Sequence, residues 1–146
     1  VLIKPERDQW APGEHNGTFR GQNPGFVTAT KALDYWENDW LEKAVGHKSK
    51  IVHQRLHAMV DRLGAEAEVR GRGLIYGIAF EDETIASQVS QACFKDHLIV
   101  ETAGMEDQVL KLLPSLTISH EDLTLGLDTI ERNLAAVLAG NQRKSA

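Results

Sequence analysis

A stripe of apolar side chains at helical spacing runs through the middle of the chain and limits what it can fold into. Its apolar members recur every three or four residues, at Leu41, Ala44, Val45, Val52, Leu56, Met59, Val60 and Leu63. This spacing places them on one face of a helix, so we expect an amphipathic helix over 40–63, with Gly64 as its C-terminal cap. The charged member of the stripe, Lys48, can lay its methylene stem along the apolar face.

The segment before this helix carries a shorter helical pattern. Four residues recur at helical spacing, namely Phe26, Ala29, Leu33 and Trp36. They predict a helix over 25–37. Residues 1–3 are typical of the end of a buried strand, which Pro5 stops. The region between them, up to residue 23, is rich in glycine and is expected to be irregular.

The remainder of the chain alternates between strand and helix patterns. Strands are expected at 66–69, 74–80, 98–101 and 109–113, with a short extension at 117–118. Residues 70–73 are expected to turn the chain. Helices are expected over 84–96 and from the capping pair Ser119 and Asp122 to Gly140. This order favours an α+β domain, with two helices on one face of a mostly antiparallel sheet.

Composition and charge narrow the class of protein. The net charge of −5 argues against a nucleic-acid partner, because such proteins usually carry a basic patch. A single cysteine, Cys93, excludes an internal disulfide and suits the cytoplasm. No apolar run approaches the length of a membrane span. The chain opens without methionine or a basic leader, which indicates mid-domain sequence and the C-terminal part of a longer protein.

A glycine-rich segment over 13–24 carries the clearest candidate binding site. Its glycines let the backbone approach a ligand closely. Thr18 offers a hydroxyl, and His15 and Arg20 can each donate a hydrogen bond to an anion. Because a helical pattern follows Pro24, the segment is a plausible phosphate contact. The alternative is a polar surface turn, in which Thr18 bonds its own backbone.

Three segments together resemble class III aminotransferases, the pyridoxal-phosphate enzymes of fold type I. They are H-N-G-T-F-R-G-Q-N-P at 15–24, V-R-G-R-G-L-I-Y-G-I at 69–78 and L-K-L-L-P-S-L-T-I at 110–118. They occur in the order that the family has, with a long helix between the first two. The resemblance implies that 1–23 is the end of the large cofactor-binding domain, 24–63 the connecting helices and 64–146 the small domain.

The resemblance also implies roles for particular residues. Thr18, with Gly17 and Phe19 beside it, matches the segment that binds the phosphate of pyridoxal 5'-phosphate in the partner subunit. Lys111 stands where many relatives carry an arginine that binds the substrate α-carboxylate, and Arg20 is a second candidate for substrate binding. Lysine cannot make the bidentate contact of arginine. Lys111 therefore either still attracts a carboxylate or has become structural at a strand edge.

Other charged or reactive residues are expected to be structural or solvent-exposed and not part of a functional site. His53 and His57 lie four residues apart, as metal ligands do, but no third ligand is evident, so we expect a solvated helix face. Cys93 lies on an apolar helical stripe and is expected to be a core residue. Arg70 and Arg72 are expected to be solvated charges beside a strand.

The chain is also expected to lack two groups that the reaction needs. Transamination needs a lysine that forms a Schiff base with the cofactor, and in the family this lysine and the acid that holds the pyridine nitrogen precede the matched region. Lys4 is not that lysine, so the chain alone is expected to be inactive. The expected partners are the rest of the polypeptide, a homodimer or higher homo-oligomer, and small amino-acid and oxo-acid substrates, without nucleic acid or membrane. The alternatives are another omega-aminotransferase of this class and a free-standing α+β ligand-binding or regulatory module.

Overall fold

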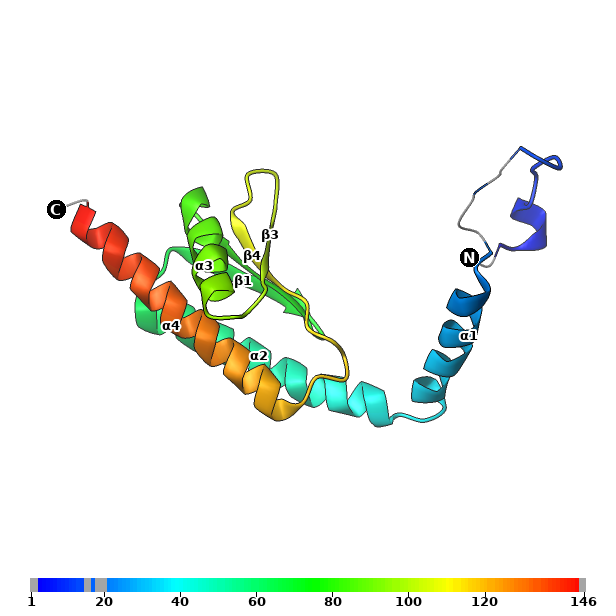
Figure 1. Ribbon diagram of the computed structural model, residues 1–146, viewed down its shortest axis with the longest axis horizontal. Coiled ribbons are helices and arrows are strands. Elements are labelled where there is room, and N and C mark those ends of the chain that lie inside the picture. The colour runs from blue at the N-terminus through cyan, green and yellow to red at the C-terminus, as the bar shows by residue number, and fades with distance from the viewer. Residues whose placement is uncertain (1–2, 15–16, 18–20, 145–146) are drawn as a thin grey trace. The chain divides into compact units, whose positions relative to one another are not determined.

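The computed structural model describes residues 3–14, 17 and 21–144. The chain divides into two compact units, Val1–Asn38 and Asp39–Ala146. Figure 1 shows the elements of each unit in chain order. None of the helices in the described part of the chain combines the length and the apolar character needed to cross a bilayer.

The first unit is a short helical segment that buries none of its described side chains. It consists of the 3₁₀ helix η1 (Pro5–Arg7), the helix α1 (Asn23–Ala32) and the 3₁₀ helix η2 (Leu33–Trp36). Pro24 lies in the first turn of α1, where its missing N–H costs nothing. The helix expected over 25–37 is confirmed, except that its last turn tightens to 3₁₀ geometry.

The long helix α2 (Trp40–Leu63) begins the second unit and has the expected bounds. Gly64 ends it in the left-handed conformation, with φ 62° and ψ 34°, which glycine adopts without strain. Within the stripe, Leu56 and Met59 are fully buried. Lys48 is also buried, and its ammonium donates to the carbonyl oxygen of Leu116 at 3.0 Å, so that its charge is satisfied at the end of the stem.

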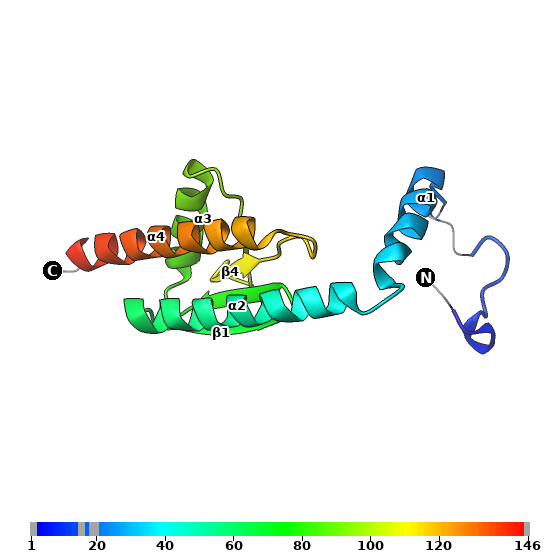
Figure 2. The ribbon, with the colours of Figure 1, turned by 90° about the horizontal axis from the view of Figure 1, so that it is seen from below.

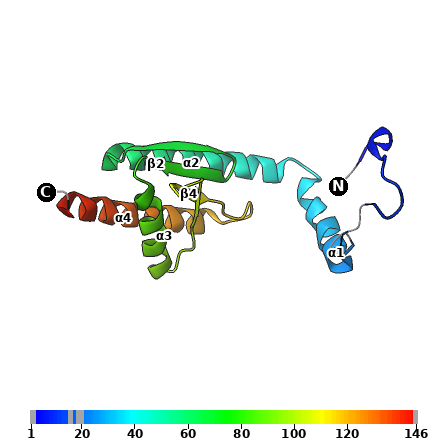
Figure 3. The same ribbon diagram turned by 90° about the horizontal axis from the view of Figure 1, so that it is seen from above.

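Four strands form one antiparallel sheet in the order β1-β2-β4-β3. The two central strands, β2 and β4, are labelled in Figure 3. Their bounds are β1 (Ala67–Arg72), β2 (Ile75–Phe80), β3 (Glu101–Ala103) and β4 (Val109–Leu112). Alternate residues of β2 and β4 face the core, as the period of two requires. The mostly antiparallel α+β architecture expected from the sequence is therefore confirmed.

The hairpin between β1 and β2 differs from the expectation that 70–73 would be a turn. Pairing continues to Arg72 and Ile75, so only Gly73 and Leu74 form the loop. Gly73 adopts φ +61°, which suits such a short loop. Gly71 lies directly opposite Tyr76, and a β-carbon built there would stand 2.3 Å from Cδ1 of that ring. Gly71 therefore leaves room for the Tyr76 ring, and Gly73 allows the two strands to be joined by a loop of only two residues.

Three helices enclose one face of the sheet. The helix α3 (Glu83–Lys95) contacts the strands, α2 contacts β1, and α4 (His120–Lys144) lies beside α2 and α3 (Figure 2). Their buried side chains join those of β2 and β4 in one hydrophobic core. Ser119 caps α4 as expected, since its hydroxyl oxygen accepts the Asp122 N–H at 2.9 Å.

Three sequence-based expectations about element ends are wrong, each for a local reason. Residues 98–100 are not a strand, because the Leu98 N–H donates to Cys93 at 2.9 Å and the Val100 carbonyl accepts from Ser90 at 2.7 Å, which ties them to α3. Residues 117–118 are not a strand either, because 116–117 form a turn in which the Ile118 N–H donates to the Ser115 carbonyl oxygen at 3.0 Å. Gly140 does not end α4, which continues to Lys144 with helical backbone through the glycine.

Candidate functional site

The predicted phosphate contact falls mainly outside the described residues. Thr18, Phe19 and Arg20 belong to that undescribed part, so their roles stay predictions. Gly17 is described and exposed. Just before it, Gly13 adopts φ +90° and the Glu14 carboxylate accepts the Ala11 N–H at 2.7 Å, so the chain turns there.

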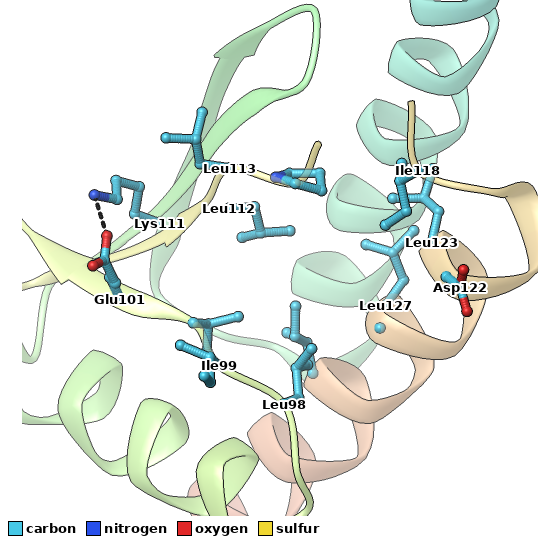
Figure 4. A pocket seen from close by; sticks show the side chains of 14 residues that line it. Leu98, Ile99, Glu101, Lys111, Leu112, Leu113, Ile118, Asp122, Leu123 and Leu127 are labelled. Atoms are coloured by element: carbon cyan, nitrogen blue, oxygen red, sulfur yellow. Dashed lines mark ion pairs between the residues drawn. The ribbon is translucent and has the colours of Figure 1, made fainter. Parts of the chain in front are cut away.

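Lys111 lies in the middle of β4, on the face of the sheet opposite the core. Glu101 of β3 is its register partner, and the Lys111 Nζ stands 2.6 Å from the Glu101 Oε2 (Figure 4). The hydrogen bond from this ammonium, and then its charge, lower the pKa of the Glu101 carboxyl below its ordinary value. Lys111 is therefore paired with a carboxylate of the neighbouring strand, a contact that is compatible with either of its two expected roles, attraction of a carboxylate or a structural position at the sheet.

A cavity of about 290 Å³ lies between the ends of β3 and β4 and the first half of α4. Its wall is mostly apolar, with Leu98, Leu112 and Leu127 among the lining residues. Figure 4 shows Lys111 and Glu101 at one end and Asp122 at the other. Sequence reasoning missed this cavity. The available signal was Gly126, a residue without a side chain that faces Leu98 from α4.

The described residues do not by themselves form a site for a phosphorylated pyridine cofactor. Such a site needs donors for a dianion and an acid for the ring nitrogen. The cavity instead has mostly apolar walls, with Asp122 at one end and, at the edge of the other end, Lys111 and Glu101 paired with each other. Two carboxylates repel a phosphate, so the residues that line this cavity do not favour phosphate binding there.

The paired histidines lie on α2 with their rings close together. The ring centroids of His53 and His57 are 4.3 Å apart. Within the described ranges, no group of three or more histidine, cysteine or acidic side chains is placed to hold a metal ion.

The single cysteine is a core residue, as the sequence predicted. Cys93 is fully buried on α3. Burial, and to a lesser extent the Asp96 carboxylate, raises the pKa of its thiol to about 11. The thiolate, which is the reactive form, is therefore suppressed at neutral pH.

An antiparallel sheet with helices on one face makes this part of the chain an α+β domain. The family model for class-III aminotransferases matches residues 5–134. The chain belongs to the class III aminotransferase family.

Curated relatives are similar over nearly the whole chain. A diaminobutyrate–2-oxoglutarate transaminase of Virgibacillus pantothenticus is 46% identical over 140 residues, which is 94% of this chain and 34% of that protein. A transaminase with the same name from Nocardia farcinica is 48% identical over 141 residues, 96% of this chain and 32% of that protein. The chain therefore spans about a third of the length of these relatives.

A solved structure supports the fold independently. Lysine aminotransferase from M. tuberculosis superposes with a TM-score of 0.74 at 25% sequence identity, covering 86% of this chain and 29% of that one. The described arrangement of sheet and helices is thus a fold type I aminotransferase arrangement.

Proposed function

We propose that the chain is the C-terminal segment of a pyridoxal-phosphate-dependent aminotransferase. The complete enzyme transfers the amino group of L-glutamate to L-aspartate 4-semialdehyde, giving L-2,4-diaminobutyrate and 2-oxoglutarate, a step of ectoine biosynthesis. The observation that carries the proposal is the 46–48% identity to diaminobutyrate–2-oxoglutarate transaminases over most of the chain. The similarity to lysine aminotransferase is weaker, at 25% identity, so another acceptor is less well supported.

The proposed cofactor is pyridoxal 5'-phosphate, which supplies the electron sink for amino transfer. Thr18, with Gly17 and Phe19, is proposed to bind its phosphate in the partner subunit, and the position of this segment just before α1 supports that role. The Schiff-base lysine is proposed to lie in the preceding part of the polypeptide, so the isolated chain should not transaminate.

Substrate binding is proposed for Lys111 and Arg20. The geometry at Lys111 supports its role, because the ammonium is seen holding the Glu101 carboxylate at 2.6 Å, a substitute for a substrate carboxylate. A lysine holds such a group as a point charge, without the planar fork of arginine.

The proposed assembly is a cytoplasmic homodimer in which 1–23 completes the large domain, 24–63 connects and 64–146 is the small domain. Exposed aromatic and apolar side chains of the first unit support a covered surface, with Phe26 57%, Leu33 64% and Trp36 61% exposed. The rest of the polypeptide and the partner subunit are the proposed cover. The single cysteine, buried in the core, suits a reducing compartment.

The test is an assay of the complete polypeptide that contains this segment. We expect 2,4-diaminobutyrate to form from aspartate 4-semialdehyde when glutamate is the donor, with dependence on added cofactor. Faster transfer to another aldehyde or oxo acid, such as an acetylornithine or lysine precursor, would instead identify a different omega-aminotransferase.

A further inference from the structure

Two histidines stand side by side on the surface of α2. His53 and His57 are separated by one helical turn, and their ring centroids are 4.3 Å apart. Side chains at this spacing lie on the same face of a helix, one above the other. His53 is exposed and His57 is half-buried, so solvent reaches both. The backbone of α2 itself therefore brings the two imidazoles together.

Among the described residues, no protein group occupies the ring nitrogens of this pair. The ring of His53 lies beside that of His57 and, at 6.3 Å between centroids, near that of Tyr76. Within the described ranges, neither imidazole takes part in a hydrogen bond or an ion pair. A neutral imidazole carries a lone pair on one nitrogen, which makes histidine the commonest metal ligand in proteins. The pair thus presents two donor nitrogens at one place on the helix.

The separation of the rings suits two neighbouring ligands of one ion. Imidazole nitrogens bind zinc, and ions of its size, at about 2.0–2.1 Å, so imidazoles at adjacent corners of a square or an octahedron have ring centroids about 4.5 Å apart. The observed separation of 4.3 Å is close to this value. A tetrahedral ion needs a wider separation, and square or tetragonal geometry with nitrogen ligands is typical of Cu²⁺ and Ni²⁺.

We propose that His53 and His57 bind a divalent late transition-metal ion, Ni²⁺ or Cu²⁺, with water completing its coordination. Two protein ligands leave the other positions to solvent, so the ion is exchangeable and lies outside the amino-transfer reaction. The affinity of nitrogen sites rises from Mn²⁺ to Cu²⁺, and Mg²⁺ prefers oxygen ligands, so the site discriminates against Mn²⁺ and Mg²⁺. Because one ion joins two successive turns of the folded helix, its binding stabilises the folded state.

A second pair of histidines provides a matched control. His47 of α2 and His120, the first residue of α4, are both exposed, and their ring centroids are 5.2 Å apart. The arrangement is edge-to-face, with 71° between the ring planes. Since the edge of one ring points at the face of the other, the two rings do not direct nitrogens toward one ion. Replacing this pair removes two imidazoles without changing the proposed site.

The experiment titrates NiCl₂ and CuCl₂ into the complete, untagged enzyme and follows binding by calorimetry. We expect a site that His53→Asn and His57→Asn each weaken by at least about tenfold, the loss caused even by removing an outer partner of a metal ligand. The double variant of His47→Asn and His120→Asn should retain the site, and Mg²⁺ should not compete for it. Electron paramagnetic resonance of bound Cu²⁺ should show two coordinating nitrogens in the wild type and one in each single variant at positions 53 and 57.

A measurement of stability separates lost binding from lost folding. Without metal, the melting temperatures of the wild type and of all these variants should agree, because the four imidazoles are at the surface. Ni²⁺ should raise the melting temperature of the wild type and of the double variant at 47 and 120, but not that of His53→Asn.

Three results would overturn the inference. The first is Ni²⁺ and Cu²⁺ binding that is the same in the wild type and in a variant that carries both His53→Asn and His57→Asn. The second is an equal loss of binding when His47 and His120 are replaced. The third is displacement of the ion by Mg²⁺, which would assign the binding to carboxylates. None of these results depends on which amino acceptor the enzyme prefers, so the inference and the proposed function fail separately.

Discussion

At the scale of single residues, three positions carry strand pairing, an ion pair and proposed cofactor binding through a single atom or group each. Gly71 permits the β1–β2 hairpin because no side chain fits between it and the ring of Tyr76. Lys111 and Glu101 form an ion pair between neighbouring strands. Thr18 is proposed to contribute a single hydroxyl. Each can be tested by changing one group.

Gly71→Ala should destabilise the second unit. The added β-carbon would meet the Tyr76 ring at 2.3 Å and the Ile75 carbonyl oxygen at 2.5 Å. Overpacking of this kind costs about 1–3 kcal/mol of the free energy of unfolding. The control is Gly46→Ala in the exposed part of α2, where nothing lies within 4 Å, and which should gain about 0.5–1 kcal/mol. Urea unfolding followed by circular dichroism compares the two, and equal effects would contradict the close approach at Gly71.

Thr18→Ala should weaken cofactor binding in the complete dimer. Losing one hydrogen bond to a charged group costs about 1.5–3 kcal/mol, or roughly ten- to a hundredfold in the dissociation constant. Thr18→Ser keeps the hydroxyl and should retain most of the affinity. Titration of the apoenzyme with pyridoxal 5'-phosphate measures both. Equal affinities for wild type and Thr18→Ala would make Thr18 a plain turn residue.

At the scale of elements, helices were predicted more accurately than strands. Side-chain periodicity located α2 to the residue, and Gly64 marked its end because a left-handed cap follows from glycine's own conformational freedom. The stretch 98–100 was misassigned because its apolar residues match a strand pattern. Its backbone hydrogen bonds are made with Ser90 and Cys93 of α3. The pattern of apolar residues within 98–100 does not indicate these partners.

The buried face of α2 should carry much of the stability of the second unit. Leu56 is fully buried in the core, so Leu56→Ala should cost about 2–5 kcal/mol of the free energy of unfolding. Gln54 lies on the exposed side of the same helix, and Gln54→Ala should stay within about 0.5 kcal/mol. Chemical denaturation of the two variants separates the faces. A small effect at Leu56 would mean that the wrong face has been assigned to the core.

The junction of α3 and α4 should weaken in acid. Asp96, just after α3, accepts hydrogen bonds from Arg132 and Asn133 of α4, and these lower the pKa of its carboxyl below 3.8. Because the folded pKa is the lower one, this stabilisation is present above pH 3.8 and is lost as the pH falls through the folded pKa. Asp96→Asn should flatten the decline in the free energy of unfolding below that pH. An unchanged acid profile would show that Asp96 does not contribute to it.

At the scale of the whole molecule, the sequence indicated the protein family better than it indicated the positions of the candidate site residues. Three segments, far apart in the chain, pointed to the family that the comparisons then showed. The pairing of Lys111 with Glu101 and the cavity beside α4 could not be predicted in this way. Both depend on strand register, since Glu101 faces Lys111 only because β3 starts at 101 and pairs antiparallel with β4.

The central claim is that this segment belongs to an enzyme that makes 2,4-diaminobutyrate. The most direct measurement is the ratio of kcat/KM for aspartate 4-semialdehyde to that for other amino acceptors, with glutamate as donor, in the complete polypeptide. We predict that aspartate 4-semialdehyde is the preferred acceptor and that 2,4-diaminobutyrate and 2-oxoglutarate form in equal amounts. A preference for a different acceptor, or no transfer from glutamate, would contradict the account.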